Sequence, residues 1–420
     1  MPDPVPEPAA GDGGPEPDSE PTPPPLQLRE PLPGVIDSAG AYESTVAAVA
    51  GGTGPVALDA ERASGYRYSP RAYLVQLRRE GAGTALIDPL PFDDLVALDE
   101  AIGDTEWILH AAIQDLPCLT ELGMHPRRLF DTELAGRLLN LPRVGLATLV
   151  SELLGYSMEK EHSAVDWSTR PLPEPWLEYA ALDVEMLVEL RDVMVTRLRE
   201  ADKLDWAHEE FEALLDYAGP MTRAEPWRRT SGIHRVRGRR SLALVRALWE
   251  ARDEVAQTRD TAPGRILPDA VIIEIARDNP SNADAVRTSP AVRSRRVRRD
   301  LEAWVEAVER AHALPDKDLP TPTAPSTGPP PARSWADRDP PAAARLAASR
   351  AVVLELAEQH DLPAENLISP DLIRRLAWEP PAELTPATVS ERLTGGGARA
   401  WQVGLIATPL AEALAAAAED

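Results

Sequence analysis

The stretch PVALDAE, residues 55–61, is a short apolar run that ends in two carboxylates one residue apart. On a β-strand alternate side chains point the same way, so Asp59 and Glu61 are expected to leave the strand side by side. Two like charges at that spacing repel each other, and one takes up a proton unless a cation lies between them. The pair is therefore either a solvated turn or half of a metal site, and D-x-E strings are too common to decide this alone.

Length and charge limit the class of protein. The chain has 420 residues, enough for two to four domains, and 43% of them are hydrophobic, so it can bury sizeable cores. Its 43 prolines indicate long connections without regular structure. The formal net charge of −24 excludes a protein coated in positive charge, so any binding of nucleic acid must depend on local basic patches.

The compartment is read from the cysteine count and the apolar segments. A single cysteine, Cys118, excludes an intramolecular disulfide framework and suits a reducing cytoplasm. The N-terminus lacks the basic region and apolar core of a signal peptide. No window approaches 18 uncharged apolar residues, because Pro409 and Glu412 interrupt the apolar run at the C-terminus. We therefore expect a soluble, cytoplasmic protein that does not bind membranes.

The pattern of residues 34–215 predicts an α/β domain. The segments 55–61, 71–79 and 83–90 have the composition of three consecutive strands separated by turn residues. Helix-like and strand-like segments then alternate, with a strand in WILHAA at 107–112, and the end of the domain is mostly helical. Three adjacent strands followed by this alternation predict a mixed sheet with helices on its faces.

The rest of the chain predicts two small all-α domains and two segments without regular structure. Residues 1–33 have the composition of a disordered, acidic, Pro-rich tail. Helical domains are expected at 223–314 and 342–418, joined by a Pro-rich linker at 315–341. Both helical domains contain a long amphipathic helix, a short polar turn and a helix that proline introduces, so we predict an internal duplication.

Further carboxylates follow the first pair along the chain. Asp115 comes just after the WILHAA strand, where an N-cap of the next helix is the alternative to a metal ligand. Asp183 and Tyr179 are four residues apart on a predicted helix and so share one face, which by itself is typical of a surface hydrogen bond. Asp131, in LFDTELA, has the position of another helix cap.

The order of these motifs resembles the DEDD family of 3′–5′ exonucleases, in the subgroup with a tyrosine in the third motif. The surrounding stretches HAAIQDL, FDTELA, GLATLVSELLG, EKEHSAVDW, RPLPEPWLEYAALDV and HRVRGRR look like those of bacterial ribonuclease D. The resemblance covers residues 34–310 and extends weakly to 418. It implies a ribonuclease-H-like exonuclease domain followed by one or more HRDC domains, which are small helical modules.

By that resemblance Asp59, Glu61, Asp115 and Asp183 hold two divalent ions, Mg²⁺ or Mn²⁺, and Tyr179 orients the attacking water. The chemistry suits phosphodiester hydrolysis, which needs an activated water and neutralised phosphoryl oxygens. The alternative subgroup has a histidine five residues before the last aspartate, and this chain has Glu178 there. The family usually has threonine where this chain has Ala60, and we expect that change to affect packing and the positioning of the RNA 3′ end.

Several other residues are candidates for contact with nucleic acid. Gln76 and Gln114 could touch substrate or fill polar roles in the core or at the surface. Trp167 and Arg170 could stack on or grip the nucleic acid, or they could anchor their loop to the domain. His110 is expected to form hydrogen bonds near the site, because hard cations rarely need a histidine ligand. Cys118 is expected to be a small buried apolar side chain.

Two arginine clusters could allow a chain of net charge −24 to bind RNA, which is also negatively charged. The first lies in 223–246, with Arg235, Arg237, Arg239 and Arg240 as candidate nucleic-acid contacts. The second begins at Arg293 and includes four more arginines up to residue 299. These clusters could guide an RNA strand toward the metals, or they could be solvated or paired within the protein.

We therefore predict a metal-dependent 3′–5′ exoribonuclease of the ribonuclease D type. Its expected partner is RNA with a free 3′ end, such as transfer RNA precursors, without an obligate protein partner. One alternative is a non-catalytic nucleic-acid-binding module that kept the fold. The other is a 3′–5′ exonuclease that acts on DNA, because metals that bind phosphates do not distinguish the sugars.

Overall fold

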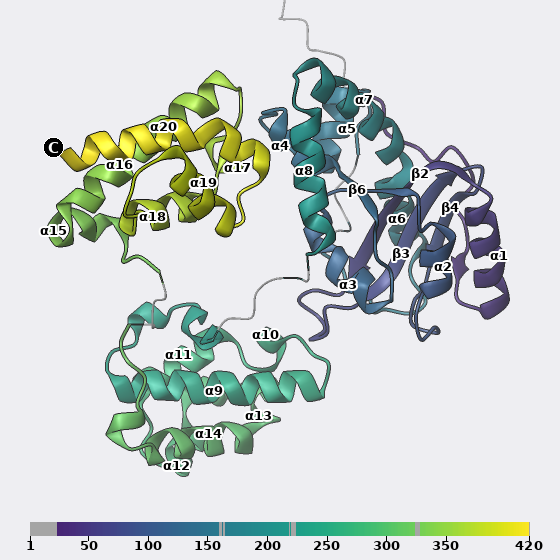
Figure 1. Cartoon of the computed structure of the whole chain (residues 1–420). Coiled ribbons are helices and arrows are strands. Elements are labelled where there is room, and N and C mark those ends of the chain that lie inside the picture. The colour runs from purple at the N-terminus through teal and green to yellow at the C-terminus, as the bar shows by residue number, and fades with distance from the viewer. Residues whose placement is uncertain are drawn as a thin grey trace, which may run out of the picture.

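The computed structural model describes residues 23–158, 162, 164–217, 219, 224–323 and 328–419. This part of the chain forms an α/β domain and two helical domains (Figure 1). Residues 1–22, where most of the predicted disordered tail falls, lie outside the described residues.

The α/β domain is built on a six-stranded mixed sheet. The strands are β1 (Val35–Ile36), β2 (Thr53–Arg62), β3 (Ala72–Glu80), β4 (Gly83–Ile87), β5 (Glu106–Leu109) and β6 (Arg128–Asp131). They lie in the order β1-β4-β3-β2-β5-β6, in which β3 is antiparallel to β2 and β4 and the other neighbours are parallel. The predicted mixed sheet is confirmed, and β1 is an edge strand that the sequence pattern did not predict.

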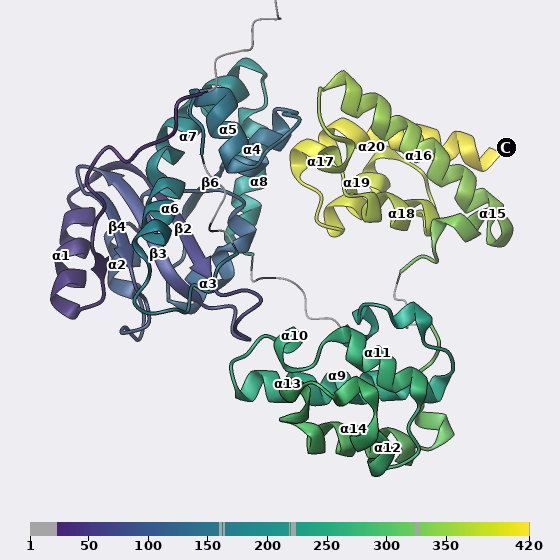
Figure 2. The ribbon, with the colours of Figure 1, turned by 180° about the vertical axis from the view of Figure 1, so that it is seen from behind.

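Helices cover both faces of this sheet. They are α1 (Ala39–Ala50), α2 (Val96–Ala101), α3 (Leu116–Glu121), α4 (Thr132–Leu138), α5 (Leu146–Leu154), α6 (Glu174–Glu185), α7 (Leu187–Glu200) and α8 (Leu204–Leu215), with a short 3₁₀ helix η1 (Ala112–Gln114). On one face α1, α2 and α3 contribute to a core with Val56 and Leu58 of β2. On the other face α6 lies against β2, β3 and β4 (Figure 2). The interior position of β2 explains its apolar residues, which are buried on both faces.

Two helical domains follow the α/β domain. The first contains η2 (Pro226–Arg229), η3 (Ile233–Arg235), α9 (Arg239–Thr258), α10 (Pro263–Ile266), α11 (Asp269–Asp278), α12 (Ala283–Thr288), η4 (Pro290–Val292), α13 (Arg295–Arg298), α14 (Leu301–Ala313) and η5 (Asp316–Asp318). The second contains η6 (Ala332–Ser334), α15 (Trp335–Arg338), α16 (Pro340–Gln359), α17 (Ala364–Leu367), α18 (Pro370–Trp378), α19 (Pro386–Gly395) and α20 (Ala400–Glu419). In both, a 20-residue helix, a four-residue helix and a helix of nine or ten residues follow in that order. The duplication itself stays a prediction.

The predicted linker over 315–341 is too long. Leu319 is buried in the core of the first helical domain, and Arg239 donates to the carbonyls of Leu319 and Pro320. At the other end Trp335 is fully buried in the second helical domain. The buried apolar side chains fix both ends of the segment, which its proline content concealed.

The predicted tail is also too long, because residues 23–33 lie against the α/β domain. Pro25 forms a parallel bridge with Ser157, and Leu26 is buried in a core that contains residues of α4 and α7. The Arg29 guanidinium forms ion pairs with Glu185 and Glu189. One buried leucine and one paired arginine thus anchor a segment whose composition is typical of disorder.

The second helical domain contacts the α/β domain through α8. The rings of Trp206 and Trp401 stack with their centroids 4.8 Å apart. The Trp401 indole N–H donates to Glu210 across 3.0 Å. Lys203 is buried and donates from Nζ to the carbonyls of Leu138 at 2.9 Å and Asp361 at 2.7 Å. Two domains are therefore fixed to each other by desolvated polar contacts as well as by stacking.

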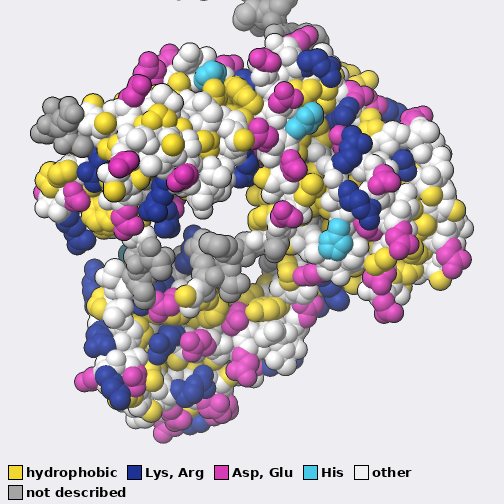
Figure 3. Space-filling view, viewed as in Figure 1, with side chains coloured by type: hydrophobic (Ala, Val, Ile, Leu, Met, Phe, Trp, Pro, Cys, Tyr) yellow, Lys and Arg dark blue, Asp and Glu magenta, His cyan; other side chains and the backbone are white. Residues whose placement is uncertain are grey.

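The first helical domain contacts the loop that follows β2. Tyr68 donates to Asp253 across 3.1 Å, and Asp260 accepts from the backbone N–H of Ser69 at 2.8 Å. The Arg265 guanidinium lies 4.0 Å from the centre of the Tyr66 ring. In the space-filling view an opening is visible between the domains (Figure 3). Acidic and basic side chains are interspersed on the face shown there, so neither charge is gathered in one place on that face.

One helix has the length and composition of a membrane span. The segment Ala400–Ala417 of α20 has a mean hydropathy of 1.2. No such segment is predicted from the sequence, because Pro409 and Glu412 interrupt the apolar run. Ile406, Leu410 and Leu414 of this helix are fully buried in the core of the second helical domain. The apolar composition of α20 thus serves the packing of that domain.

Candidate active site

Three carboxylates from two elements meet at the end of β2. Asp59 and Glu61 lie on the strand, and Asp183 lies on α6, which packs across it. One ligand oxygen of each of these residues lies within 4.8 Å of the other two. The alternation of the strand places the first two side by side, as the sequence predicts, and the helix supplies the third.

The opposite strand positions Asp59. Gln76 of β3 pairs with Asp59 in the register of the antiparallel ladder, and its side-chain N–H donates to Asp59 Oδ2 across 2.8 Å. Gln76 has no exposed surface. Between the two acids, Ala60 points the other way into the core of the domain, as expected for a residue that affects packing.

Asp115 enters the same pocket from the loop after β5. Its side chain is 4% exposed and does not cap α3, so the predicted alternative of an N-cap is not realised. Asp115 lies outside the group of three but lines the pocket of about 240 Å³ that Asp59, Glu61 and Asp183 also line. All four predicted carboxylates therefore face one pocket, with three of them at mutual ligand distance.

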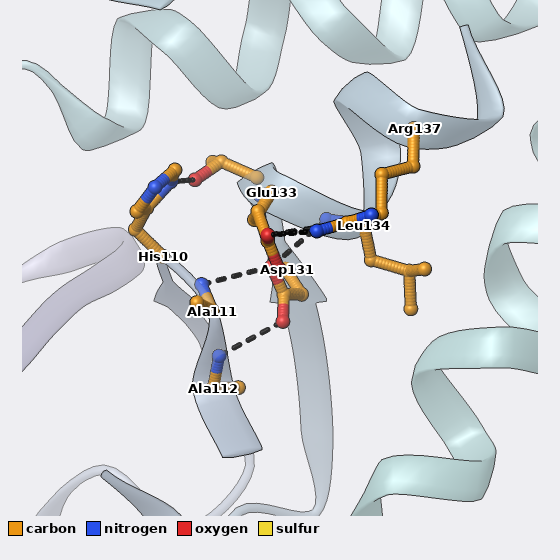
Figure 4. Close-up of polar contacts among 8 residues, drawn as sticks. His110, Ala111, Ala112, Asp131, Glu133, Leu134 and Arg137 are labelled. Carbon is orange, nitrogen blue, oxygen red and sulfur yellow. Dashed lines mark hydrogen bonds and ion pairs between the residues drawn. The ribbon is translucent and has the colours of Figure 1, made fainter. Parts of the chain in front are cut away.

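Asp131 holds the loop that presents Asp115 (Figure 4). As predicted, it caps α4, accepting from the backbone N–H groups of Glu133 at 2.8 Å and Leu134 at 3.1 Å. It also accepts from Ala111 at 3.1 Å and Ala112 at 2.8 Å, just where Ala111 adopts a left-handed φ of 58°. This buried carboxylate satisfies four backbone donors and so fixes a turn that the sequence disfavours.

Tyr179 lies one turn before Asp183 on α6 and lines the pocket. Burial raises the pKa of its phenol well above the usual value, and the neighbouring Asp183, Glu61 and Asp59 raise it further. The phenol is therefore neutral and can donate a hydrogen bond. The two side chains share one face of α6, as the helical spacing predicts, and a hydrogen bond from Tyr179 lowers the pKa of Asp183.

The carboxylates oppose each other's ionisation. Burial raises the pKa of Asp59 to about 6. Burial, followed by repulsion from Asp59, Asp183 and Asp115, raises the pKa of Glu61 to about 10. The pKa values of Asp115 and Asp183 are also raised well above the usual value, first by burial and then by Asp59. Without cations the pocket therefore retains protons at neutral pH, which is the strain expected of an empty metal site.

His110 and Cys118 lie beside the carboxylates. The His110 Nδ1 lies 2.9 Å from the Thr132 hydroxyl, and burial lowers the pKa of the imidazole to about 4, so it is neutral. This confirms the expected hydrogen-bonding role next to the site. Cys118 is 1% exposed, as predicted for a small buried side chain, and burial raises the pKa of its thiol to about 12.

Two of the predicted nucleic-acid contacts are fully buried, and a third, Arg170, is bonded within the protein. Gln76 is fully buried and bonded to Asp59, and Trp167 has no exposed surface. Arg170 donates to Asp88, to the carbonyl of Tyr73 and to two carbonyls of its own loop. The anchoring alternative therefore describes Trp167 and Arg170. Trp167 has no surface to offer a nucleic acid, whereas contact of the partly exposed Arg170 with nucleic acid stays a prediction. Gln114 is exposed and lines the pocket, so its contact with substrate stays a prediction.

The arginine clusters divide in the same way. Arg239 donates to two carbonyls of the segment after α14. Arg240 donates to two carbonyls in the last turn of α14 and to the carbonyl of Leu314, and it pairs with Asp316. These two residues hold the chain in place, as the paired alternative states. Arg235 and Arg237 are exposed, and so are all five arginines from Arg293 to Arg299. Contact of these exposed residues with RNA stays a prediction.

Sequence reasoning missed two residues at the pocket. Arg62 follows Glu61 on β2 and lines the pocket with the carboxylates. The His162 ring lies 6.0 Å from the Tyr179 ring in an edge-on contact. Strict strand alternation assigns Arg62 to the opposite face from Glu61, so periodicity could not identify it. His162 does not line the pocket itself, and although it falls in the quoted stretch EKEHSAVDW, nothing in that stretch singled it out.

The donor set fits hard divalent cations. Carboxylate oxygens are the ligands that Mg²⁺ and Mn²⁺ prefer, and no cysteine or histidine belongs to the group of three. The raised pKa values show that the four acids are poor neighbours without a positive charge between them. The pocket can therefore hold divalent cations.

Three family descriptions match successive parts of the chain. Residues 35–199 match the 3′–5′ exonuclease family, and residues 241–308 match the HRDC domain. Residues 328–414 match a 3′ to 5′ exonuclease C-terminal domain. These ranges coincide with the α/β domain and the two helical domains.

Relatives of known name and solved structures are similar to the chain over most of its length. The chain is 32% identical over 338 residues to ribonuclease D of Gluconacetobacter diazotrophicus, covering 78% of this chain and 82% of that protein. It is 32% identical over 334 residues to ribonuclease D of Granulibacter bethesdensis, covering 77% and 81%. A structure of a protein from Bifidobacterium adolescentis is 40% identical, with a TM-score of 0.85 over 95% of this chain and all of that one. Escherichia coli RNase D, an exoribonuclease involved in structured RNA processing, is 26% identical, with a TM-score of 0.65 over 92% and 98%.

Proposed function

Because the chain belongs to the ribonuclease D family of 3′–5′ exoribonucleases, we propose that it trims the 3′ ends of structured RNAs, with transfer RNA precursors among its substrates. The observation that carries the proposal is the convergence of Asp59, Glu61 and Asp183 within 4.8 Å, with Asp115 in the same pocket. The role of the Escherichia coli enzyme in structured RNA processing supports the choice of structured RNA.

Two divalent ions, Mg²⁺ or Mn²⁺, are the proposed cofactors. Asp59, Glu61 and Asp183 would hold one ion, and Asp115 would hold a second together with Asp59. Support for a shared Asp59 comes from its place in the group of three and from its charge, which raises the pKa of Asp115 more than any other charge does. When bound, such ions acidify a water and neutralise phosphoryl oxygens. Gln76 would keep Asp59 in the orientation that both ions require.

The neutral residues around the carboxylates would orient the water and the RNA. Tyr179 remains protonated across the physiological range, so its hydroxyl can hold the attacking water by a hydrogen bond. His110 is neutral and fixed by Thr132, and it could accept or donate at the pocket wall. Gln114 at the mouth of the pocket would contact the terminal nucleotide.

The test is trimming of an RNA with a 3′ extension. The purified protein with Mg²⁺ or Mn²⁺ should give a ladder of products that shorten from the 3′ end and that vanish when a chelator is added. Asp59→Asn should retain the fold and lose trimming. Asp104→Asn, which changes an exposed aspartate, is the matched control and should trim at the normal rate.

The same assay separates the alternatives. Full activity of Asp59→Asn would contradict the metal mechanism, and binding of RNA without any shortening would favour a non-catalytic binding module. Equal trimming of a matched DNA strand would show that the enzyme does not select the sugar. Preference for a transfer RNA precursor over an unstructured strand of equal length would support the proposed substrate.

A further inference from the structure

Arg62 lies in the catalytic pocket although strand periodicity directs it elsewhere. It is the last residue of β2 and lines the pocket together with Asp59, Glu61 and Asp115. The ladder between β2 and β3 is irregular at this point, because Glu61 pairs with Leu74 whereas Arg62 pairs with Ala72. Such irregularities increase the local twist of a strand and re-aim the side chain that follows. This explains how two consecutive residues can reach one pocket.

Among the described residues, none forms a hydrogen bond or an ion pair with the guanidinium of Arg62. Its Nε atom is buried without a hydrogen-bond partner, and no described residue forms an ion pair with it within 4.0 Å. Burial of this N–H without an acceptor costs free energy, because the desolvated donor loses its bond to water. Unlike Arg79, Arg252 and Arg399, whose Nε atoms are also buried without a partner, Arg62 forms no hydrogen bond or ion pair through its other nitrogens with the described residues. The remaining guanidinium nitrogens donate no hydrogen bond to any residue in the described part of the chain. A ligand with acceptor oxygens would satisfy this side chain.

Its charge nevertheless acts on the site. The positive charge of Arg62 opposes the burial that raises the pKa of Asp59, Glu61 and Asp115. Arg62 lines one pocket with all three carboxylates and forms no hydrogen bond or ion pair with any of them. Four acids and two divalent ions would sum to zero charge, and Arg62 adds one positive charge to that sum. A phosphodiester carries one negative charge, which matches the excess.

We propose that Arg62 is a substrate-contacting catalytic residue that donates to the non-bridging oxygens of the phosphodiester at the RNA 3′ end. The proposal rests on the proposed function of the carboxylate pocket. In hydrolysis the oxygen of water bonds to phosphorus as the bond from phosphorus to the 3′ oxygen breaks. The departing 3′ oxygen ends as a hydroxyl with a proton that the water loses. Negative charge builds up on the non-bridging oxygens during this step, and a guanidinium fork suits those oxygens.

The first experiment uses Arg62→Met, which keeps the length of the side chain without its charge, and Arg71→Met as an exposed control on the neighbouring strand segment. Arg62→Met should lower kcat/KM for a 3′-extended RNA by about 100-fold, a typical loss for one donor at developing charge. Arg62→Lys should recover only part of that loss, because an ammonium cannot form the fork. Arg71→Met should leave kcat/KM unchanged.

The second experiment measures binding without turnover. RNA affinity is measured by fluorescence anisotropy with Ca²⁺, using an RNA with a neutral methylphosphonate at the last linkage or at the linkage before it. The modified last linkage should weaken binding to the normal protein by about tenfold and to Arg62→Met by less than about twofold. Modification of the other linkage should weaken binding to both proteins equally.

Mn²⁺ titration of the protein without RNA separates a substrate contact from a structural role. If Arg62 contacts substrate, Arg62→Met should bind Mn²⁺ as well as the normal protein or more tightly, because a repelling charge is lost. Weaker Mn²⁺ binding, a normal kcat/KM or equal effects of the methylphosphonate on both proteins would overturn the proposal. Failure of the normal protein to trim RNA at all would instead overturn the proposed function.

Discussion

The side-chain amide of Gln76 donates a hydrogen bond to Asp59 Oδ2 across 2.8 Å, from directly opposite positions on two antiparallel strands. Gln76 is fully buried, and its amide oxygen has no partner in the described part of the chain. Asp59 is therefore the described residue to which the buried Gln76 side chain is hydrogen-bonded. Because Gln76 is buried, its side chain has little freedom to move, and its hydrogen bond therefore fixes the orientation in which Asp59 would bind a cation.

Gln76→Leu should weaken metal binding because Asp59 loses the donor that orients it. The expected loss of Mn²⁺ affinity is about 10- to 100-fold, as for other residues that orient a metal ligand. Titration calorimetry with Mn²⁺ measures this affinity directly. Gln114→Leu, at the exposed mouth of the same pocket, should leave Mn²⁺ affinity unchanged. Equal Mn²⁺ affinity of Gln76→Leu and the normal protein would contradict an orienting role.

Asp131→Ala should unfold the protein more easily and also weaken metal binding. Four backbone N–H groups lose their acceptor, and the turn at Ala111 that presents Asp115 loses its support. We expect a loss of about 3 kcal/mol or more in the free energy of unfolding, measured with urea. Asp94→Ala removes the acceptor of a single N–H at the start of α2 and should cost less than about 1 kcal/mol. Comparable losses in the two variants would show that the four hydrogen bonds of Asp131 contribute little to the free energy of unfolding.

The metal-free protein should become less stable as pH rises. The folded-state pKa of Asp59 is raised to about 6 and that of Glu61 to about 10, so the folded protein binds more protons than the unfolded chain above about pH 4. Stability is then lost from about pH 4 through pH 6 and beyond, with Asp59 contributing on the order of 3 kcal/mol. Urea unfolding in the presence of a chelator at several pH values measures this.

Mn²⁺ should reverse that trend, because it binds the ionised carboxylates and stabilises the folded state more as pH rises. Asp59→Asn should remove the part of the pH dependence near pH 6 and make the metal-free protein more stable than normal at pH 8. Metal-free stability that rises between pH 6 and pH 8 would contradict the mutual repulsion of the carboxylates.

Arg170→Lys should lower stability and leave RNA affinity unchanged. The guanidinium bonds to both oxygens of the buried Asp88 and to three backbone carbonyls, which an ammonium cannot reach together. The expected loss is about 3 kcal/mol in the free energy of unfolding. RNA affinity at a temperature where the variant is folded provides the second measurement. A specific loss of RNA affinity without loss of stability would contradict a purely structural role and support contact of Arg170 with nucleic acid.

The fold and the acids could be predicted from the sequence because they depend on short-range patterns. The strand that carries Asp59 and Glu61, and the helical spacing of Tyr179 and Asp183, are local features. Asp115 was recognisable only from the order of motifs, because its own neighbourhood is equally typical of an N-cap.

The supporting residues could not be predicted because their contacts depend on pairing across the sheet. Gln76 meets Asp59 only in one register of β2 and β3. Arg62 reaches the pocket through an irregularity in the same ladder, and Arg170 finds Asp88 over 82 residues. The composition of residues 23–33 and 315–341 is typical of disorder, but single buried side chains such as Leu26 and Trp335 fix their ends.

The most direct test of the central claim is anomalous diffraction from crystals of the protein soaked in Mn²⁺. Convergence of the four acids on one pocket predicts two anomalous peaks about 3.5–4 Å apart, with Asp59 within ligand distance of both. Peaks should be lost in crystals of Asp59→Asn. Absence of any peak in that pocket, or a single ion that Asp115 does not approach, would contradict the two-ion site.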